Sequence, residues 1–289
     1  MSQTTSTNPQ IRLNDGVTIP QLGFGVFQVP PEDTEQVVTH ALEVGFRSID
    51  TAAGYKNEEG VGAAVAASGL ARDEIFVTTK LANPDQGHDS ALAAFDASMG
   101  KLDLDVLDLY LIHWPSPARG EFVNTWKAFI ELQQAGRIRS IGVSNFLPHH
   151  FTELFEATEV VPSVNQIELH PYLQQKELRT FHAQHGILTE AWSPIAQGDC
   201  LDDPIITGIA ERLGATAAQV VLRWHLQLGN IVIPKSVTPS RMRENLGALE
   251  ITLGEEDIAA IEGLDRGEDG RRGFHPDRFN AFPEDFEKR

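Results

Sequence analysis

Residues 75–113 read IFVTTKLANPDQGHDSALAAFDASMGKLDLDVLDLYLIH, and this stretch decides the fold. It begins with a β-branched apolar run at 75–80, continues with apolar residues at helical spacing over 89–101, and ends with a second apolar run at 107–112. A strand, a helix and a second strand in that order are typical of a βαβ unit, in which the two strands lie parallel.

The same alternation recurs along the chain with a period of roughly 30 residues. Further strand-like runs occupy 46–50, 138–143, 163–167, 187–191 and 231–233, and helical segments occupy 33–44, 57–68, 121–135, 148–157, 174–185 and 203–228. Residues 22–25 supply a first strand, which makes eight. We therefore predict an α/β fold, a (β/α)8 TIM barrel, built as a single domain over residues 1–289.

An open, doubly wound sheet is the competing architecture. No G-x-G-x-x-G motif follows the first strand, where residues 23–28 read GFGVFQ. Polar residues also mark the ends of nearly all the strands, as they do when every strand end faces one barrel mouth. Both features favour the barrel.

Two segments lie outside the repeat. Residues 11–19 contain Asp15-Gly16, a dipeptide that suits a type I′ turn, and we predict a β-hairpin that plugs one end of the barrel. Residues 267–289 are rich in Gly, Arg, Asp and Pro and are predicted to form an irregular C-terminal tail.

The charge and the single cysteine argue against several classes of protein. Asp and Glu total 41 against 23 Lys and Arg, which gives a net charge of −18, so we expect no nucleic-acid or membrane partner. Cys200 excludes an internal disulfide, suits a reducing compartment, and has no evident base beside it. No apolar run approaches a membrane span, and residues 1–10 lack the apolar stretch of a signal peptide, so we expect a cytoplasmic protein.

Four residues with acid–base chemistry follow successive apolar runs: Asp50, Tyr55, Lys80 and His113. Taken singly, such an Asp is more often a cap, and such a Tyr or His more often packs in the core. Because all strand ends of a barrel face one mouth, the four together predict an active site.

Lys80 beside Tyr55 is expected to favour the phenolate and so lower the pKa of Tyr55, while Asp50 holds the ammonium in place. His113 is expected to hydrogen-bond to the substrate oxygen and orient it. A group of this kind donates a proton to an oxygen that gains negative charge, as happens in carbonyl reduction.

Ordered blocks along nearly the whole chain resemble the aldo-keto reductase family. The blocks are GFRSIDTA (45–52), Tyr55 with NEE (57–59), TTKL (78–81), LIHWP (111–115), IGVSNF (141–146), NQIELHP (165–171), AWSP (191–194) and IPKSV (233–237). Within the family, the chain is most similar to the bacterial 2,5-diketo-D-gluconate reductases. The resemblance implies NADPH-dependent reduction of aldehydes or ketones, keto-sugars and dicarbonyls included.

The resemblance also implies roles for individual residues. Tyr55 would donate the proton, Lys80 and Asp50 would tune its pKa, and His113 would orient the substrate. Ser144, Asn145 and Gln166 would hold the carboxamide, and the nicotinamide ring would stack on Trp192. Lys235, Ser236 and Arg241 would contact the 2′-phosphate, and Glu244 and Asn245 the adenine. Ser193 and Val237 would also contact the cofactor.

The phosphate end is also readable from the residues themselves. Lys235, Ser236, Arg241 and Arg243 form a basic, hydroxyl-bearing cluster around a helix predicted to begin at about residue 239. Because a helix N-terminus attracts anions, the cluster predicts a phosphate site in this acidic protein. A solvated basic turn is the other interpretation.

The substrate pocket is expected to include Phe27 and Trp114. Ala82 stands where diketogluconate reductases tend to carry Trp, so we expect a bulkier or differently shaped carbonyl compound. The sequence does not name that substrate, and a monomer is expected only because the family is often monomeric.

Two other functions stay open: an NADPH-binding regulatory subunit with little turnover, and a Schiff-base lyase that uses Lys80. Pairing with Asp50 would keep Lys80 protonated and oppose the second. No metal site is expected, since no Cys or carboxylate set accompanies His149-His150 or the pair His182 and His185.

Overall fold

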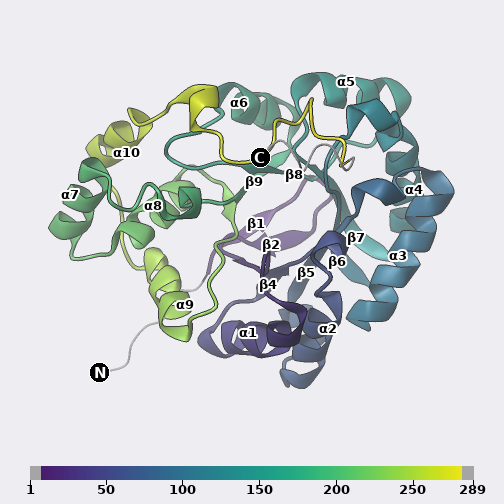
Figure 1. Cartoon of the computed structure of the whole chain (residues 1–289), viewed down its shortest axis with the longest axis horizontal. Helices are drawn as coiled ribbons and strands as arrows, with labels where there is room; N and C mark the ends of the chain where they lie inside the picture. The colour runs from purple at the N-terminus through teal and green to yellow at the C-terminus, as the bar shows by residue number, and fades with distance from the viewer. Residues whose placement is uncertain (1–7, 282–289) are drawn as a thin grey trace.

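Eight parallel strands enclose the centre of the structure, a computed structural model that describes residues 8–281 (Figure 1). Each strand pairs with the next one in the chain. Leu22 also bridges Val232 in parallel, and the Gly23 amide donates to the Val232 carbonyl at 2.8 Å, so the first and last strands meet. The predicted (β/α)8 barrel is confirmed. The strands are β3 (Phe24–Gly25), β4 (Ser48–Asp50), β5 (Phe76–Leu81), β6 (Leu107–Ile112), β7 (Ile138–Ser144), β8 (Val164–Glu168), β9 (Leu188–Trp192) and β10 (Ile231–Val232).

Helices form an outer ring around these strands (Figure 1). Every barrel strand is followed by at least one α-helix before the next strand or the end of the fold. The helices are α1 (Pro31–Val44), α2 (Glu58–Ala67), α3 (His88–Leu102), α4 (Phe122–Gln134), α5 (Pro148–Ala157), α6 (Lys176–His185), α7 (Pro204–Leu213), α8 (Ala217–Gln227), α9 (Pro239–Leu246) and α10 (Glu255–Glu262).

The single helical segment predicted over 203–228 is wrong, because the chain breaks into α7 and α8 with a bend of 93°. Gly214 ends α7 in the left-handed conformation, with φ of 62°. Thr216 then begins α8 with a capping box, in which its hydroxyl accepts from the Gln219 amide and the Gln219 side chain accepts from the Thr216 amide. No single helix within residues 8–281 is long and apolar enough to cross a membrane, although α7 and α8 together reach that composition.

Alternation along the strands separates the barrel interior from the layer beneath the helices. In β5, Phe76 belongs to the inner cluster, whereas Val77 and Leu81 belong to the outer one. Lys80 therefore shares the inward face with Phe76 and lies two inward-facing positions nearer the carboxyl end of the barrel, beyond Thr78. By the same alternation along β4, β8 and β9, the side chains of four more residues point into the barrel: Asp50, Gln166, Glu190 and Trp192.

The predicted hairpin forms from β1 (Gln10–Arg12) and β2 (Thr18–Pro20) and lies across the barrel (Figure 1). Leu13 and Ile19 pack with Phe76 and other interior residues, so the hairpin closes the amino-terminal end of the barrel. The predicted type I′ turn is wrong. That turn needs positive φ at Asp15 and Gly16, but only Gly16 has it, at 92°, because the Gly16 amide bonds back to Leu13.

The C-terminal tail begins with a short 3-10 helix, Gly267–Gly270, where an irregular loop was predicted. It then runs as a loop past the ends of β9 and β8 towards α5 (Figure 1). The last part of the predicted tail, 282–289, and residues 1–7 of the polar N-terminus lie outside the described residues.

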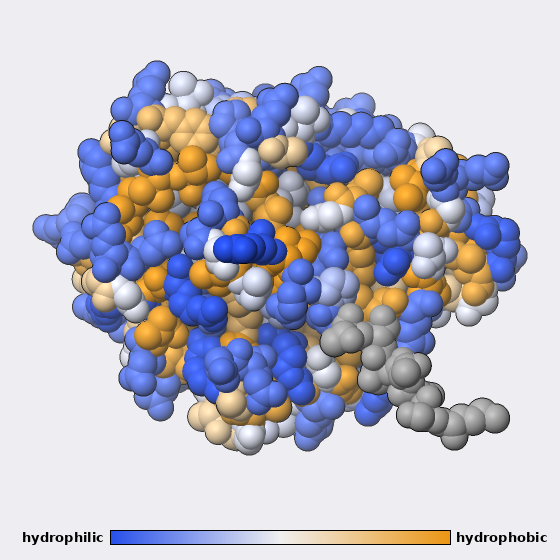
Figure 2. Space-filling view, turned by 180° about the vertical axis from the view of Figure 1, so that it is seen from behind, coloured by the Kyte–Doolittle hydropathy of each residue, from blue (hydrophilic) through white to orange (hydrophobic). Residues whose placement is uncertain are grey.

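On the face of the molecule opposite to that of Figure 1, hydrophilic residues lie between the hydrophobic ones (Figure 2).

Candidate active site

A buried ion pair lies at the carboxyl end of the barrel interior. Asp50 ends β4, and its Oδ1 lies 2.6 Å from Nζ of Lys80 in β5, with both side chains buried. Nζ also donates to the Thr51 carbonyl at 2.9 Å. Burial lowers the pKa of Lys80, but the Asp50 carboxylate offsets this and leaves it above its usual value. A lysine kept charged in this way is a poor imine-forming nucleophile, which argues against the Schiff-base lyase.

Tyr55 and His113 lie beside this pair, so the structure brings together all four residues predicted from the strand ends. Tyr55 lies in the short 3-10 helix Ala53–Tyr55 that follows β4, and Nζ of Lys80 lies 5.1 Å from the centre of its ring. His113 directly follows β6, and its ring meets that of Tyr55 edge-on at 5.6 Å between centroids. A substrate oxygen at this point would face a phenol, an ammonium and an imidazole.

The Lys80 ammonium does act to lower the pKa of Tyr55, as expected. The net shift is nevertheless upward, so the expectation of a lowered pKa is wrong. Burial raises the pKa of Tyr55 and outweighs the Lys80 ammonium, so the hydroxyl stays protonated at neutral pH. Burial and the Lys80 charge lower the pKa of His113 to about 3, which keeps its ring neutral. The site thus presents one protonated phenol and one uncharged imidazole.

The residues predicted to contact nicotinamide form one hydrogen-bonded group at the ends of β7, β8 and β9. Ser144 Oγ donates to the Gln166 carbonyl at 2.8 Å. Asn145 Nδ2 donates to Ser144 Oγ and to the His113 carbonyl, each at 3.0 Å. Trp192 Nε1 donates to Asn145 Oδ1 at 2.9 Å, which fixes its indole next to this group. The mouth of the barrel therefore carries amide, hydroxyl and aromatic groups in one connected set.

The residues predicted for the phosphate end lie between β10 and α9 and within α9, which begins at residue 239 as predicted. Lys235 and Arg241 are exposed, and neither forms an ion pair with any residue from 8 to 281. Ser236 is buried, and its Oγ accepts from the Thr238 amide at 3.2 Å. The other predicted cofactor residues are exposed Val237, half-buried Ser193 and Glu244, and buried Asn245.

The three residues predicted to line the substrate pocket lie on loops that follow β3, β5 and β6. Phe27 is 49% exposed, and its ring lies 5.0 Å from that of Tyr55 between centroids. Ala82 is half-buried directly after β5, and Trp114 is buried directly after His113.

The tail adds two aromatic residues that the sequence analysis missed. The ring of Phe279 lies 4.8 Å from that of Trp114, and Phe274 stacks on Phe279 at 4.2 Å between centroids. No local pattern predicts these contacts, because the partners are far apart in the chain.

Comparison with known proteins agrees with this site. The pattern of the aldo/keto reductase family matches residues 21–266. An aldo-keto reductase of Mycolicibacterium smegmatis is 58% identical over 94% of this chain and 98% of that protein. The chain belongs to the aldo/keto reductase family. Methylglyoxal reductase DkgA of Escherichia coli is 50% identical to this aldo/keto reductase, over 94% of its chain and 98% of the relative. A mutant of Gox0644 solved in complex with NADPH superimposes with a TM-score of 0.91 at 52% identity, over 94% and 99% of the two chains.

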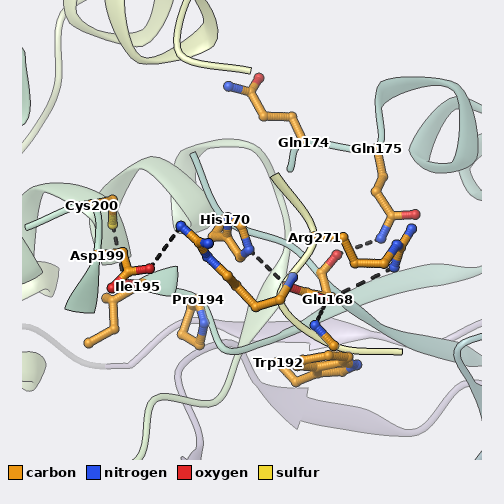
Figure 3. A network of polar contacts seen from close by, with 12 residues as sticks. Glu168, His170, Gln174, Gln175, Trp192, Pro194, Ile195, Asp199, Cys200 and Arg271 are labelled. Carbon is orange, nitrogen blue, oxygen red and sulfur yellow. Dashed lines mark hydrogen bonds and ion pairs between the residues drawn. The ribbon is translucent and has the colours of Figure 1, made fainter. Parts of the chain in front are cut away.

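Glu168, at the end of β8, anchors the tail of the reductase (Figure 3). Its carboxylate accepts the backbone N–H groups of Arg272 at 2.7 Å and Gly273 at 2.8 Å, and His170 Nε2 lies 3.0 Å from it. A Cβ on Gly273 would lie 2.5 Å from the Trp192 ring, so glycine is needed where the tail passes this indole. His170 thus has a structural place in this network, beside the carboxylate that holds the tail.

The expectation that no carboxylate accompanies His149 and His150 is wrong, because the tail brings Asp277 to them. Oδ1 of Asp277 lies 2.9 Å from Nε2 of His149 and 3.3 Å from Nε2 of His150. The Leu147 amide donates to Nδ1 of His150, so the proton of neutral His150 lies on Nε2 and faces Asp277. A protonated nitrogen does not ligate a metal, and the group fits a polar tie between the tail and α5.

Proposed function

We propose that this chain reduces small aldehydes and ketones, dicarbonyls such as methylglyoxal and keto-sugars among them, with Tyr55 as the proton donor. As a member of the aldo/keto reductase family it is an NADP-dependent oxidoreductase, and NADPH is its cofactor. The observation that supports Tyr55 most directly is its place beside the Lys80–Asp50 pair and the neutral His113 ring.

In the proposed reaction, Tyr55 gives its hydroxyl proton to the carbonyl oxygen as that oxygen gains negative charge. The raised pKa of Tyr55 keeps the proton in place at neutral pH until then. The Lys80 ammonium, held by Asp50, stabilises the tyrosinate that remains. Neutral His113 donates a hydrogen bond to the same oxygen and sets the direction in which the carbonyl points.

The nicotinamide end of the cofactor fits the group at the ends of β7, β8 and β9. Bound NADPH supplies the hydride. Ser144, Asn145 and Gln166 offer hydroxyl and amide groups of the kind that pair with a carboxamide. Trp192, held by Asn145, offers an aromatic surface for the ring.

Lys235→Ala is expected to weaken NADPH binding roughly 10- to 100-fold while changing NADH binding little, because a charge-assisted hydrogen bond to the 2′-phosphate is lost. The support is an exposed, unpaired Lys235 beside the N-terminus of α9, within residues 8–281. Fluorescence titration with both cofactors measures the two affinities. Lys127→Ala removes an exposed cation from α4 and serves as the control, with no change expected in either affinity. Equal losses for NADPH and NADH in Lys235→Ala would count against a 2′-phosphate contact.

The predicted pocket residues suit a substrate that has a small carbonyl group and whose remaining part packs against aromatic rings. Phe27 and Trp114 line the approach to Tyr55 and His113, and Phe279 of the tail packs on Trp114. Ala82 directly follows β5 and has a small side chain, so we expect the enzyme to accept a ketone branched next to its carbonyl. The 50% identity to a methylglyoxal reductase makes methylglyoxal the first compound to test.

The test is NADPH consumption by the purified protein with methylglyoxal, aromatic aldehydes and 2,5-diketo-gluconate, with NADH in parallel. Turnover that is faster with NADPH supports the proposal, and the ranking of substrates tests the role of Ala82. Tight NADPH binding without turnover on any of them would favour a regulatory binding subunit. Gel filtration tests the expected monomer, and the cytoplasmic location stays a prediction.

A further inference from the structure

A second buried carboxyl group lies inside the barrel next to the Asp50–Lys80 pair. Glu190 is 1% exposed and faces inward with Leu188 and Trp192, its neighbours two positions away on β9. In the sheet it is level with Gln166 on β8 and Ile231 on β10. Its Oε2 is buried and has no hydrogen-bond partner within residues 8–281. The proposed function gives this group no role.

The charged groups that act on Glu190 are Asp50 on β4 and Lys80 on β5. The residues level with it on β8 and β10, Gln166 and Ile231, do not titrate. Gln166 Nε2 donates to Asp50 Oδ2 at 2.8 Å, so one amide lies beside both carboxyl groups. The charge of Glu190 in turn reaches Tyr55, which lies beyond Lys80.

Two carboxyl groups here share one ammonium. If both were ionised, the interior would hold one negative charge without a partner, which is costly in a medium of low dielectric constant. Asp50 has the short contact to Lys80, so Glu190 is the group that stays neutral. Burial, with the Asp50 charge added, raises the pKa of Glu190 to about 8. At neutral pH, Glu190 is therefore mostly an uncharged acid.

We propose that Glu190 is a positioning residue that must stay uncharged for reduction, and that its ionisation weakens Tyr55 as a proton donor and so switches the reductase off in alkaline solution. The proposal rests on Tyr55 being the proton donor. A negative Glu190 would compete with Asp50 for Lys80 and would raise the pKa of Tyr55 further, because both carboxylates act on the phenol. Both effects make proton transfer to the substrate less favourable.

The experiment compares the pH profile of kcat for carbonyl reduction in the wild type and in Glu190→Gln, each normalised to its own value at neutral pH. The wild type is expected to lose activity with a midpoint near pH 8. In Glu190→Gln, whose amide does not titrate, this loss moves upward by about one pH unit or more. Glu58→Gln removes a buried carboxyl outside the barrel interior, bonded to Thr79, and is expected to keep the wild-type profile.

Thermal unfolding gives a readout that does not depend on activity. Because the pKa of Glu190 is higher in the folded protein than in the unfolded chain, its contribution to stability is fully present at acidic pH and is lost as the pH rises towards about 8. Glu190→Gln should therefore unfold at a higher temperature than the wild type near pH 8, and this advantage should vanish in acid.

Two outcomes would overturn the role of Glu190: an unshifted alkaline loss in Glu190→Gln, or the same pH dependence of Tm in both proteins. If Tyr55→Phe is inactive while either of these is observed, the reductase assignment stands and only the inference about Glu190 fails. An active Tyr55→Phe would instead overturn the proposed function.

Discussion

Tyr55→Phe is expected to lower kcat for carbonyl reduction by roughly two or more orders of magnitude while NADPH still binds. The substitution removes one hydroxyl proton and leaves the aromatic ring that packs on Phe27 and meets His113. The Lys80–Asp50 pair does not depend on that hydroxyl, so the interior should keep its charges and its fold. Steady-state kinetics with the best aldehyde, together with fluorescence titration of NADPH, gives both quantities.

Tyr110→Phe is a matched control for this loss. Tyr110 is fully buried, its hydroxyl has no hydrogen-bond partner within the described residues, and its ring stacks on Phe129 outside the barrel interior. Removing that hydroxyl should leave turnover near the wild-type value. If Tyr55→Phe turned over at a similar rate to Tyr110→Phe, Tyr55 would not be the proton donor.

Lys80→Met is expected to lower the free energy of unfolding by about 3–5 kcal/mol, in addition to losing activity. Lys80 is fully buried, and its ammonium neutralises Asp50 at 2.6 Å. Without it, the Asp50 carboxylate keeps the hydrogen bond from Gln166 but has no counter-charge among residues 8–281. Urea unfolding at neutral pH measures the difference from the wild type.

The double variant Lys80→Met with Asp50→Asn separates charge from shape. It removes both charges, so most of the stability should return while the activity stays lost. A single variant as stable as the wild type at neutral pH would mean that the pair contributes little to folding.

The strand parity explains why so much of the site could be predicted. A side chain two positions along a strand returns to the same face, so Ser48 predicts the direction of Asp50, and Thr78 that of Lys80. All barrel strands end at one mouth, which brings together residues that are far apart in sequence. The same rule applies to Glu190, two positions before Trp192, and was the signal by which it could have been found.

The errors over the helical segment 203–228 and in the hairpin have different causes. Over 203–228 the helical periodicity continues across a break, but Gly214 and the capping box of Thr216 with Gln219 mark it in the sequence. In the hairpin, Asp15-Gly16 could either form a two-residue turn by itself or lie within a longer loop. The hydrogen bond from the Gly16 amide to the Leu13 carbonyl belongs to the longer loop. Turn type depends on strand register, which the packing of the hairpin under the barrel decides.

By itself, the sequence determined the barrel, the order of its elements and the faces on which Asp50 and Lys80 lie, because periodicity and strand parity are local properties of the chain. Only the tertiary structure decided the pKa of Tyr55 and the uncharged state of Glu190, since desolvation depends on everything packed around a group. It also decided that the tail places Phe279 on Trp114, because an irregular segment has no periodicity that fixes its path.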